Sequence, residues 1–483
     1  MHNKSIRELV TYLKTRKISS EELTLFFLER IKKYDLFLNS FITVDYKNSV
    51  NTSIKFDYTS KLGSNNIGIP FGIKDSFCSS GLKTTCGSRM LSTYIAPYDS
   101  TVSTKLRNSN FILLGKTNMD EFSMGSSGET SFYGLTRNPW DFTRVPGGSS
   151  SGSASSVAAR LIPFALGSDT GGSVRQPASF CGVTGFKPTY GSISRYGLIA
   201  FSSSLDQCGI ITKSAEDCAY VFDKLVGVDS KDSTSYCRNN CSPIKFINNS
   251  IVGVKVGIFS DSLIKGISKD VSCSLFEGIN VLQNLGCLVK EVTLPSFNMT
   301  VSAYYVFSSI ECSSNLLRYD GFRYGYNKNK KNNYNSNCFL TRSFGFGEEV
   351  KRRILLGTYL TTRKNVNYYE NALLVRNRLI DECINIFKEV DILFCPTTAT
   401  TAFSINEKVS DPVTMYLSDV FTTFVNLVGL PAISIPIGFS EGGLPIGAQI
   451  VSAHFNECLL LNIAHIYQEN TNWHTKVPAF FVD

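Results

Sequence analysis

An α/β fold, in which helices cover a β-sheet, is predicted by the alternation of helical and strand-like segments along this 483-residue chain. Residues 101–108 have the pattern of a helix and are followed by a strand-like segment at 111–114. Later, a long helical pattern at 369–388 leads into a strand-like segment at 392–394. Such alternation is typical of a sheet covered by helices. Because 43% of the residues are hydrophobic, a chain of this length can bury a large core.

The first 60 residues are predicted to form a helical lead-in to the sheet. Ser5 with Glu8, and Ser19 with Glu22, have the spacing of capping boxes, which mark the starts of helices. Apolar residues at helical spacing follow the second box. We therefore expect two amphipathic helices here.

A buried strand is predicted at residues 67–73, an apolar run interrupted by glycines and a proline. The run ends at Lys74, which is therefore expected at the end of a core strand. Farther along, residues 255–259 and 287–292 are predicted strands on either side of a helix at 272–285.

Residues 326–338 are rich in Asn and Lys and form the one low-complexity stretch of the chain. This composition suits an exposed loop, with contact to RNA or to a partner as the alternative. The net charge of +8 permits such contact but does not require it.

Composition excludes several classes of protein. No apolar run is long enough to cross a bilayer, and the polar N-terminus lacks the apolar core of a signal peptide, so a cytoplasmic protein without membrane contact is expected. The cysteines form no CxxC pair and the four histidines lack metal-ligand spacing, so no metal site is expected. Gly115, Lys116 and Thr117 resemble the end of a phosphate-binding loop, but Asn110 replaces the required glycine.

Two segments rich in Gly and Ser, residues 146–156 and 167–175, carry the candidate chemistry. A flexible linker is the alternative interpretation, but the apolar residues 161–166 between them place both segments in a structured core. Glycines beside serines let backbone N–H groups approach a reacting carbonyl closely, as an oxyanion hole requires. The candidate amides are those of Thr170, Gly171, Gly172 and Ser173.

A serine nucleophile in these segments needs a base. The histidines are His2 and three residues in the C-terminal tail, far from the Gly/Ser-rich segments in sequence. A lysine can replace histidine when burial lowers its pKa enough for the amine to be neutral near pH 7. Lys74, at the end of its apolar run, is the natural candidate.

These motifs resemble those of the amidase signature family. Its members carry a lysine in an Ile-Lys-Asp context, a Gly-Gly-Ser-Ser block and a nucleophilic serine in Asp-x-Gly-Gly-Ser; here these are Lys74, Ser149 and Ser173. The resemblance implies that Ser173 is the nucleophile, that Ser149 is a bridging serine in a cis peptide, and that Lys74 is the base. Ser151 departs from the family's usual glycine but leaves both reactive serines in place.

The resemblance also implies a fold. Residues 1–483 are expected to form a single amidase signature domain, with a large central mixed β-sheet covered on both faces by α-helices. Its Gly/Ser-rich catalytic core is expected at about residues 67–215.

Within the family, the chain is similar to the members that hydrolyse L-glutamine inside amidotransferase complexes, with supporting segments at 115–122 and 194–200. In those members an arginine holds the α-carboxylate of glutamine, an aspartate holds its α-amino group, and a tyrosine lines the pocket. The resemblance assigns these roles to Arg353, Asp419 and Tyr304. A guanidinium fork suits a carboxylate and an acid suits an ammonium group, so the assignment is chemically coherent.

The same resemblance implies a heterotrimer with companion B and C subunits. Ammonia would pass to the B subunit, which uses ATP and magnesium to activate the carboxyl group of a misacylated tRNA. This chain is therefore expected to bind no cofactor and to meet tRNA only through its partner.

Two alternatives stay open. A free-standing amidase of the same fold would keep the triad but would not need Arg353 and Asp419 as a pair that recognises an amino acid. An inactive scaffold protein is disfavoured because Lys74, Ser149 and Ser173 are all present.

Overall fold

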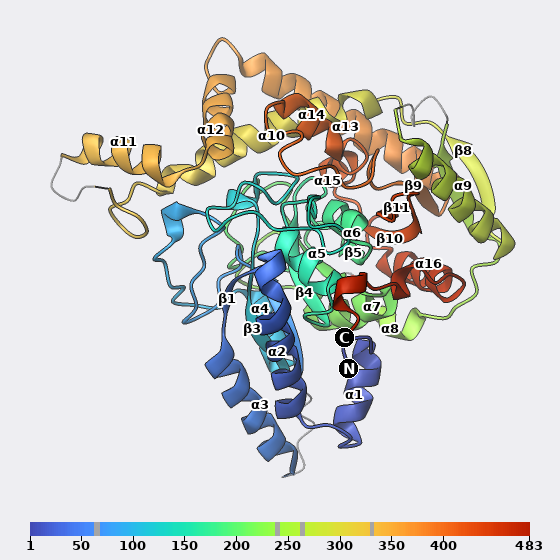
Figure 1. The fold of residues 1–483 in the computed structure, drawn as a ribbon. Helices are drawn as coiled ribbons and strands as arrows, with labels where there is room; N and C mark the ends of the chain where they lie inside the picture. The colour runs from blue at the N-terminus through green and yellow to red at the C-terminus, as the bar shows by residue number, and fades with distance from the viewer. Residues whose placement is uncertain (62–67, 237–241, 261–265, 329–332) are drawn as a thin grey trace.

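The protein was analysed as a computed structural model, which describes residues 1–61, 68–236, 242–260, 266–328 and 333–483 (Figure 1). One 11-stranded sheet runs through it in the order β1-β3-β2-β4-β6-β5-β10-β11-β9-β7-β8. Parallel and antiparallel neighbours both occur, so the predicted α/β fold with a large mixed sheet is confirmed. Among the described residues, no helix is both long and apolar enough to span a membrane.

The strands are β1 Phe41–Val44, β2 Ile69–Lys74, β3 Phe111–Thr117, β4 Phe164–Asp169, β5 Thr184–Lys187, β6 Gln207–Thr212, β7 Lys255–Phe259, β8 Leu288–Val292, β9 Ile392–Pro396, β10 Ala432–Phe439 and β11 Pro445–Ser452. The α-helices are α1 Ile6–Lys14, α2 Ser20–Leu38, α3 Tyr46–Lys61, α4 Thr101–Asn108, α5 Ser151–Ala158, α6 Arg175–Cys181, α7 Ala215–Leu225, α8 Pro243–Phe246, α9 Lys269–Asn284, α10 Thr300–Asn315, α11 Tyr334–Gly345, α12 Glu348–Leu360, α13 Val366–Glu389, α14 Pro412–Tyr416, α15 Thr423–Val428 and α16 Glu457–Glu469.

Local sequence signals place the N-terminal elements correctly. Both predicted capping boxes form: Ser5 and Glu8 cap α1, and Ser19 and Glu22 cap α2. The predicted strand at 67–73 corresponds to β2, although residue 67 lies outside the described residues. The later helix and strand predictions correspond to α9, β7, β8, α13 and β9.

Helices cover both faces of the sheet, as two glycines on adjacent strands demonstrate. Gly438 on β10 lies against Ser274 of α9, whereas Gly447 on β11 lies against Ser179 of α6. Gly438 is paired with Ile446, the neighbour of Gly447. Because successive residues of a strand point to opposite faces, α9 and α6 lie on opposite faces of the sheet.

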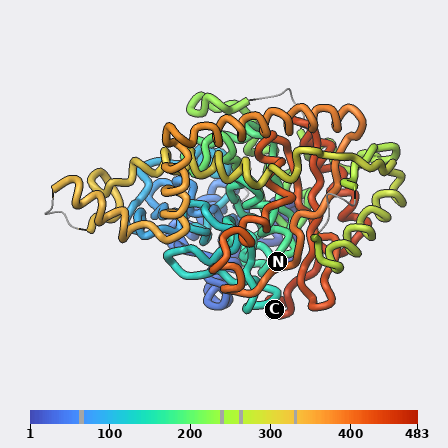
Figure 2. The backbone as a smooth tube through the Cα atoms, turned by 90° about the horizontal axis from the view of Figure 1, so that it is seen from above, coloured from blue at the N-terminus to red at the C-terminus, as the bar shows by residue number. Residues whose placement is uncertain are grey.

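The prediction of an exposed loop at 326–338 is partly wrong. Residues 329–332 lie outside the described residues, but residues from Tyr334 onward begin α11, which projects from the body in both views (Figures 1 and 2). The side chain of Asn333 accepts a hydrogen bond from the Ser336 amide and so starts the helix. The predicted exposure is correct, because residues 333–336 are exposed, but asparagine serves here as a helix cap.

The close approach of α10 and α12 sets the distance between two elements that carry candidate site residues. A Cβ atom added to Gly357 of α12 would lie 2.0 Å from the backbone oxygen of Ser309 in α10. Tyr304 is on α10 and Arg353 is on α12, one turn from Gly357. Glycine is therefore required at this contact by lack of space.

We expect Gly357→Ala to lower the free energy of unfolding by about 1–3 kcal/mol, because overpacking outweighs alanine's higher helix propensity. Gly442→Ala is the matched control, since the nearest atom to its added Cβ is 3.8 Å away. Urea denaturation of both variants measures the difference. Equal stability of the two variants would contradict the close-packing argument.

Candidate active site

The predicted base lies at the carboxyl end of β2, where the side chain of Lys74 is completely buried. Its Nζ donates hydrogen bonds to Ser149 Oγ at 2.7 Å and to Ser168 Oγ at 2.9 Å. Burial lowers the pKa of Lys74 to about 7, against the opposing influence of Asp120 and Asp169. A neutral amine is therefore accessible near neutral pH. The neutral Nζ of Lys74 can accept a hydrogen bond from the Ser149 hydroxyl instead of donating one.

Sheet register explains how Lys74 reaches the serines. β2 and β4 are parallel neighbours, and Ile73 is paired with Leu166. Both strands therefore end at the same edge of the sheet, with Lys74 ending β2 and Asp169 ending β4. The Gly/Ser-rich segment 167–175 leaves the sheet directly beside the lysine.

Ser149 belongs to a second loop at the same edge. The peptide bond between Gly148 and Ser149 is cis, and the Gly148 amide donates to Gln176 Oε1 at 2.9 Å. The amide of Ser150 donates to the carbonyl of Ser173 at 3.1 Å. These bonds join the loop of Ser149 to that of Ser173, so the structure brings the three predicted triad residues to one place.

Ser173 differs from every neighbour in its accessibility. From Val145 to Thr189, a stretch described without gaps, Ser173 is the one residue that is not buried. A nucleophile must meet its substrate, whereas its supporting residues are best kept from water. The burial pattern thus singles out the serine that the motif identified.

The loop before Ser173 requires its two glycines. Gly172 has φ +131°, and a Cβ there would lie 2.2 Å from Thr422 Oγ1. A Cβ on Gly171 would lie 2.5 Å from the ring of Tyr304. The aromatic ring therefore rests directly on the loop that was predicted to hold the oxyanion.

One predicted oxyanion amide is already occupied. The N–H of Gly172 donates to Asp169 Oδ1 at 2.9 Å, because the carboxylate of Asp169 is folded back under the loop. In this arrangement the Gly172 amide is not aimed at substrate. The amides of Thr170, Gly171 and Ser173 are the remaining candidates.

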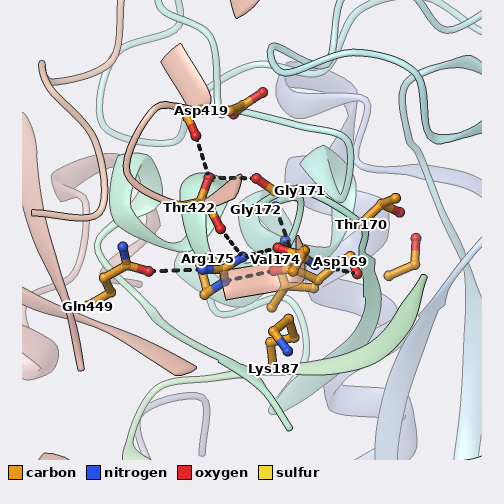
Figure 3. A network of polar contacts seen from close by, with 12 residues as sticks. Asp169, Thr170, Gly171, Gly172, Val174, Arg175, Lys187, Asp419, Thr422 and Gln449 are labelled. Atoms are coloured by element: carbon orange, nitrogen blue, oxygen red, sulfur yellow. Dashed lines mark hydrogen bonds and ion pairs between the residues drawn. The ribbon is translucent and has the colours of Figure 1, made fainter. Parts of the chain in front are cut away.

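A buried ion pair between Asp169 and Arg175 holds this loop (Figure 3). Arg175 Nε and Nη2 each donate to one carboxylate oxygen of Asp169 at 3.0 Å, and both side chains are inaccessible to solvent. Burial alone would raise the pKa of Asp169, but Arg175 overcomes it and lowers that pKa to about 2. The ion pair therefore braces the loop that carries Ser173.

Arg353, the predicted carboxylate ligand, is held in an aromatic cage. Its guanidinium lies 4.6 Å from the ring centroid of Tyr305 and 5.0 Å from that of Tyr416, and its Nε donates to Glu349 Oε1 at 2.7 Å. Arg353 is 3% exposed, and its Nη1 is buried without a hydrogen-bond partner among the described residues. An unpaired buried donor on a fixed cation is suited to a carboxylate ligand.

Asp419, the predicted ligand of the amino group, is also buried. It accepts a hydrogen bond from Ser126 Oγ at 2.6 Å. Burial raises the pKa of Asp419 to about 7, and the Ser126 bond and the charge of Arg353 oppose this rise. Because the charges of Arg353 and Asp419 also act on the pKa of Tyr304, which burial raises, the three predicted substrate residues share one electrostatic environment.

A cavity of about 270 Å³ adjoins this region. Its lining includes Ser126, Glu349, Arg353, Lys408 and Tyr416. Arg353 is the one predicted substrate residue in this lining, which contains neither Asp419 nor Tyr304 and none of the three predicted triad residues.

The structure adds residues that sequence patterns did not identify. Ser168 is the second acceptor for Lys74, and Ser126 fixes Asp419. Thr422 Oγ1 donates to the carbonyls of Gly171 and Asp419, at 2.6 and 3.1 Å, and thereby links the serine loop to the Asp419 segment (Figure 3). Ser168 lies inside the Gly/Ser-rich segment 167–175 and could have been found there, whereas no sequence signal marked Ser126 or Thr422.

The segment that resembled a phosphate-binding loop has another role. Lys116 is completely buried, and its Nζ lies 3.1 Å from Asp75 Oδ1 and donates to the carbonyl of Phe77. The Nζ of Lys116 therefore has its partners inside the fold, which agrees with the rejection of a phosphate site.

Comparison with known proteins agrees with this site. Residues 22–461 match the family described as Amidase. The chain is 48% identical to the A subunit of glutamyl-tRNA(Gln) amidotransferase from Nitrosococcus oceani, with 99% of this chain and 100% of the relative covered. It is also 48% identical to the protein of the same name from Coxiella burnetii, with 99% of each chain covered.

Comparison with solved structures points to the same family. The crystal structure of the A subunit of glutamyl-tRNA(Gln) amidotransferase from Thermotoga maritima is 39% identical, with a TM-score of 0.81 and with 99% of this chain and 98% of that chain covered. The peptide amidase of Stenotrophomonas maltophilia, at 24% identity and a TM-score of 0.83 over 97% of each chain, shares the fold. With a family match over most of its length and relatives this similar end to end, the chain belongs to the amidase family.

Proposed function

We propose that this chain is the glutaminase component of a cytoplasmic glutamyl-tRNA(Gln) amidotransferase, a glutamine-hydrolysing carbon–nitrogen ligase. The main support is the full-length similarity to proteins named as the A subunit of that enzyme. The buried contact between Lys74 and Ser149 beside an accessible Ser173 supports amide hydrolysis by a Ser-Ser-Lys triad.

In the proposed reaction, Ser173 Oγ attacks the side-chain amide carbon of L-glutamine. Its proton passes to Ser149, whose own proton passes to the neutral amine of Lys74 across the 2.7 Å contact. The resulting oxyanion would be held by amides from Thr170, Gly171 and Ser173. Lys74 returns the proton through Ser149 to the departing nitrogen, ammonia leaves, and water hydrolyses the acyl-enzyme to glutamate.

Arg353, Asp419 and Tyr304 are proposed to select L-glutamine. The unpaired Nη1 of Arg353 would bind the α-carboxylate and Asp419 would bind the α-ammonium group, while the ring of Tyr304 packs beside Gly171. Two opposite charges at fixed positions select an amino acid over a simple amide. This feature favours a glutaminase over a free-standing amidase with an apolar substrate.

The released ammonia is proposed to pass to a companion B subunit, with a C subunit completing a heterotrimer. ATP and magnesium would act on the B subunit, where the carboxyl group of Glu-tRNA(Gln), or of Asp-tRNA(Asn), is activated. The choice of tRNA would then depend on the partners and not on this chain.

Ser173→Ala should lower ammonia release from L-glutamine by about a thousandfold or more, because the acyl-enzyme cannot form. The assay uses this chain co-expressed with its B and C partners, with and without ATP and Glu-tRNA(Gln). The wild-type complex should release ammonia faster when both are present.

Ser151→Ala is the matched control, since Ser151 lies two residues after Ser149 and its Oγ makes only long contacts, 3.3 Å to Thr136 Oγ1 and 3.5 Å to the Asn118 carbonyl. It should keep most of the activity. Undiminished ammonia release by Ser173→Ala would rule out the proposed nucleophile, and turnover of simple amides without glutaminase activity would favour the free-standing amidase.

The rate should rise with pH through about 7. Lys74 acts as a base only when it is neutral, and its pKa is lowered to about 7, so activity is lost as pH falls below that value. The pH dependence of kcat reports mainly the ionisation of Lys74, because Asp419 is already paired with substrate in the saturated enzyme. A kcat that is independent of pH between about 5.5 and 9, in a complex that stays folded, would contradict a lysine base.

Asp419→Asn and Arg353→Lys should each raise KM for L-glutamine by about 10- to 100-fold, the effect of losing one hydrogen bond to a charged group. Asparagine can still accept the Ser126 hydrogen bond, so the local fold is kept. Propionamide, which lacks the α-carboxylate and α-amino groups, serves as the control substrate, and its slow hydrolysis should be unchanged. Equal losses with both substrates would indicate a structural role instead.

A further inference from the structure

Glu349 lies in the first turn of α12, one helical turn before Arg353. Its Oε1 accepts hydrogen bonds from Arg353 Nε at 2.7 Å and from the hydroxyl of Tyr416 at 3.1 Å. Its Oε2 forms an ion pair with Arg352. Both oxygens of this carboxylate are therefore engaged by side chains of the protein itself.

The contact with Tyr416 links α12 to the segment that contains Asp419. Tyr416 is the last residue of α14, and Asp419 follows it by three residues. Burial raises the pKa of Tyr416, so its hydroxyl stays protonated and donates the hydrogen bond to Glu349. Glu349 thus joins the helix that carries Arg353 to the segment that carries Asp419.

The other close neighbours of the Arg353 guanidinium are aromatic rings. It lies 4.6 Å from the ring centroid of Tyr305, 5.0 Å from that of Tyr416 and 5.8 Å from that of Phe201. Such rings attract a cation but provide no acceptor atom that fixes the direction of its N–H groups. In the part of the chain that the structure describes, Glu349 is the one carboxylate paired with Arg353. Because this bond occupies Nε, a carboxylate ligand would meet the terminal nitrogens of the guanidinium fork.

Glu349 is poorly suited to bind substrate directly, although it lines the cavity of about 270 Å³ together with Arg353 and Tyr416. An ammonium ligand needs a free acceptor, and both oxygens of Glu349 already have partners. Its negative charge would also repel the α-carboxylate of an amino acid bound at Arg353. Charge and geometry at Glu349 therefore have opposite effects on binding, which allows an experiment to separate them.

We propose that Glu349 is a positioning residue for L-glutamine, which fixes the guanidinium of Arg353 for the α-carboxylate and does not itself touch the substrate. This inference rests on the proposed function, because it concerns the same substrate site. Its specific content is that the acceptor oxygen of Glu349 is required and that the negative charge is not.

The test measures steady-state hydrolysis of L-glutamine and of propionamide by the complex of this chain with its B and C partners. Glu349→Ala should raise KM for L-glutamine by about tenfold or more, because the guanidinium is no longer held in place. The kcat for L-glutamine and the hydrolysis of propionamide should stay within about threefold of wild type, since Glu349 does not touch the triad.

Glu349→Gln separates geometry from charge. Glutamine keeps one oxygen for the bonds from Arg353 and Tyr416, and the exposed Arg352 can turn toward solvent. The KM of this variant for L-glutamine should therefore equal the wild-type value or fall below it. Glu348→Ala is the matched control, because exposed Glu348 also lies in the first turn of α12 and lines the same cavity. It removes the same charge and should leave KM unchanged.

A double-mutant cycle tests whether Glu349 acts through Arg353. Arg353→Met removes the guanidinium, and in that background Glu349→Ala should cause no further increase in KM. A further increase of about tenfold would mean that Glu349 acts on the substrate by a separate route, and it would overturn the proposal.

Two other results would also overturn it. One is an increase in KM in Glu349→Gln equal to that in Glu349→Ala, because the charge would then be the required feature. The other is an equal loss of activity with L-glutamine and propionamide in Glu349→Ala, which indicates a structural role. A wild-type KM in Glu349→Ala would contradict this inference alone, whereas no hydrolysis of L-glutamine by the wild-type complex would contradict the proposed function and this inference with it.

Discussion

The candidate active site depends on the buried ion pair between Asp169 and Arg175. A buried pair of this kind costs desolvation, and removing one partner leaves an uncompensated charge at a cost of about 3–5 kcal/mol. Here the cost is offset by further bonds. Arg175 also donates to Gln449 Oε1 at 2.9 Å (Figure 3) and to Asn426 Oδ1 at 2.6 Å. Asp169 in turn fixes the amide of Gly172. The ion pair therefore sets the shape of the loop that carries Ser173 and ties that loop to the C-terminal half of the chain.

Two buried lysines, Lys74 and Lys116, differ in their partners, and this difference separates a candidate base from a structural residue. Lys74 ends β2, and Lys116 is the residue before the end of the neighbouring β3, where it is paired with Ile73. Lys116 has a carboxylate partner inside the fold, because its Nζ lies 3.1 Å from Asp75 Oδ1. Lys74 contacts the hydroxyls of Ser149 and Ser168, and a hydroxyl stabilises an ammonium ion less than a carboxylate does. Burial consequently lowers the pKa of Lys74 into the range where a base is useful.

The proposed recognition residues and the proposed triad come from different parts of the fold. The triad lies where β2 and β4 end, whereas Tyr304 and Arg353 come from α10 and α12. Thr422 joins the two parts through the carbonyls of Gly171 and Asp419. Movement of the Asp419 segment would therefore be transmitted directly to the loop of Ser173.

The sequence by itself determined the local elements and the choice of the candidate reactive groups. Capping boxes placed α1 and α2, alternation predicted the α/β class, and the family motifs identified Lys74, Ser149 and Ser173. These signals are local, because a cap or a motif is complete within a few residues.

Only the tertiary structure decided the supporting contacts and the use of individual atoms. Ser126 meets Asp419 across 293 residues, and Thr422 meets Gly171 across 251. The same holds for the Gly172 amide, which donates to Asp169, and for Glu349, whose carboxylate accepts from Arg353 and Tyr416. The physical reason is that such contacts depend on the order of strands in the sheet and on competition among neighbouring donors and acceptors, which no local pattern encodes.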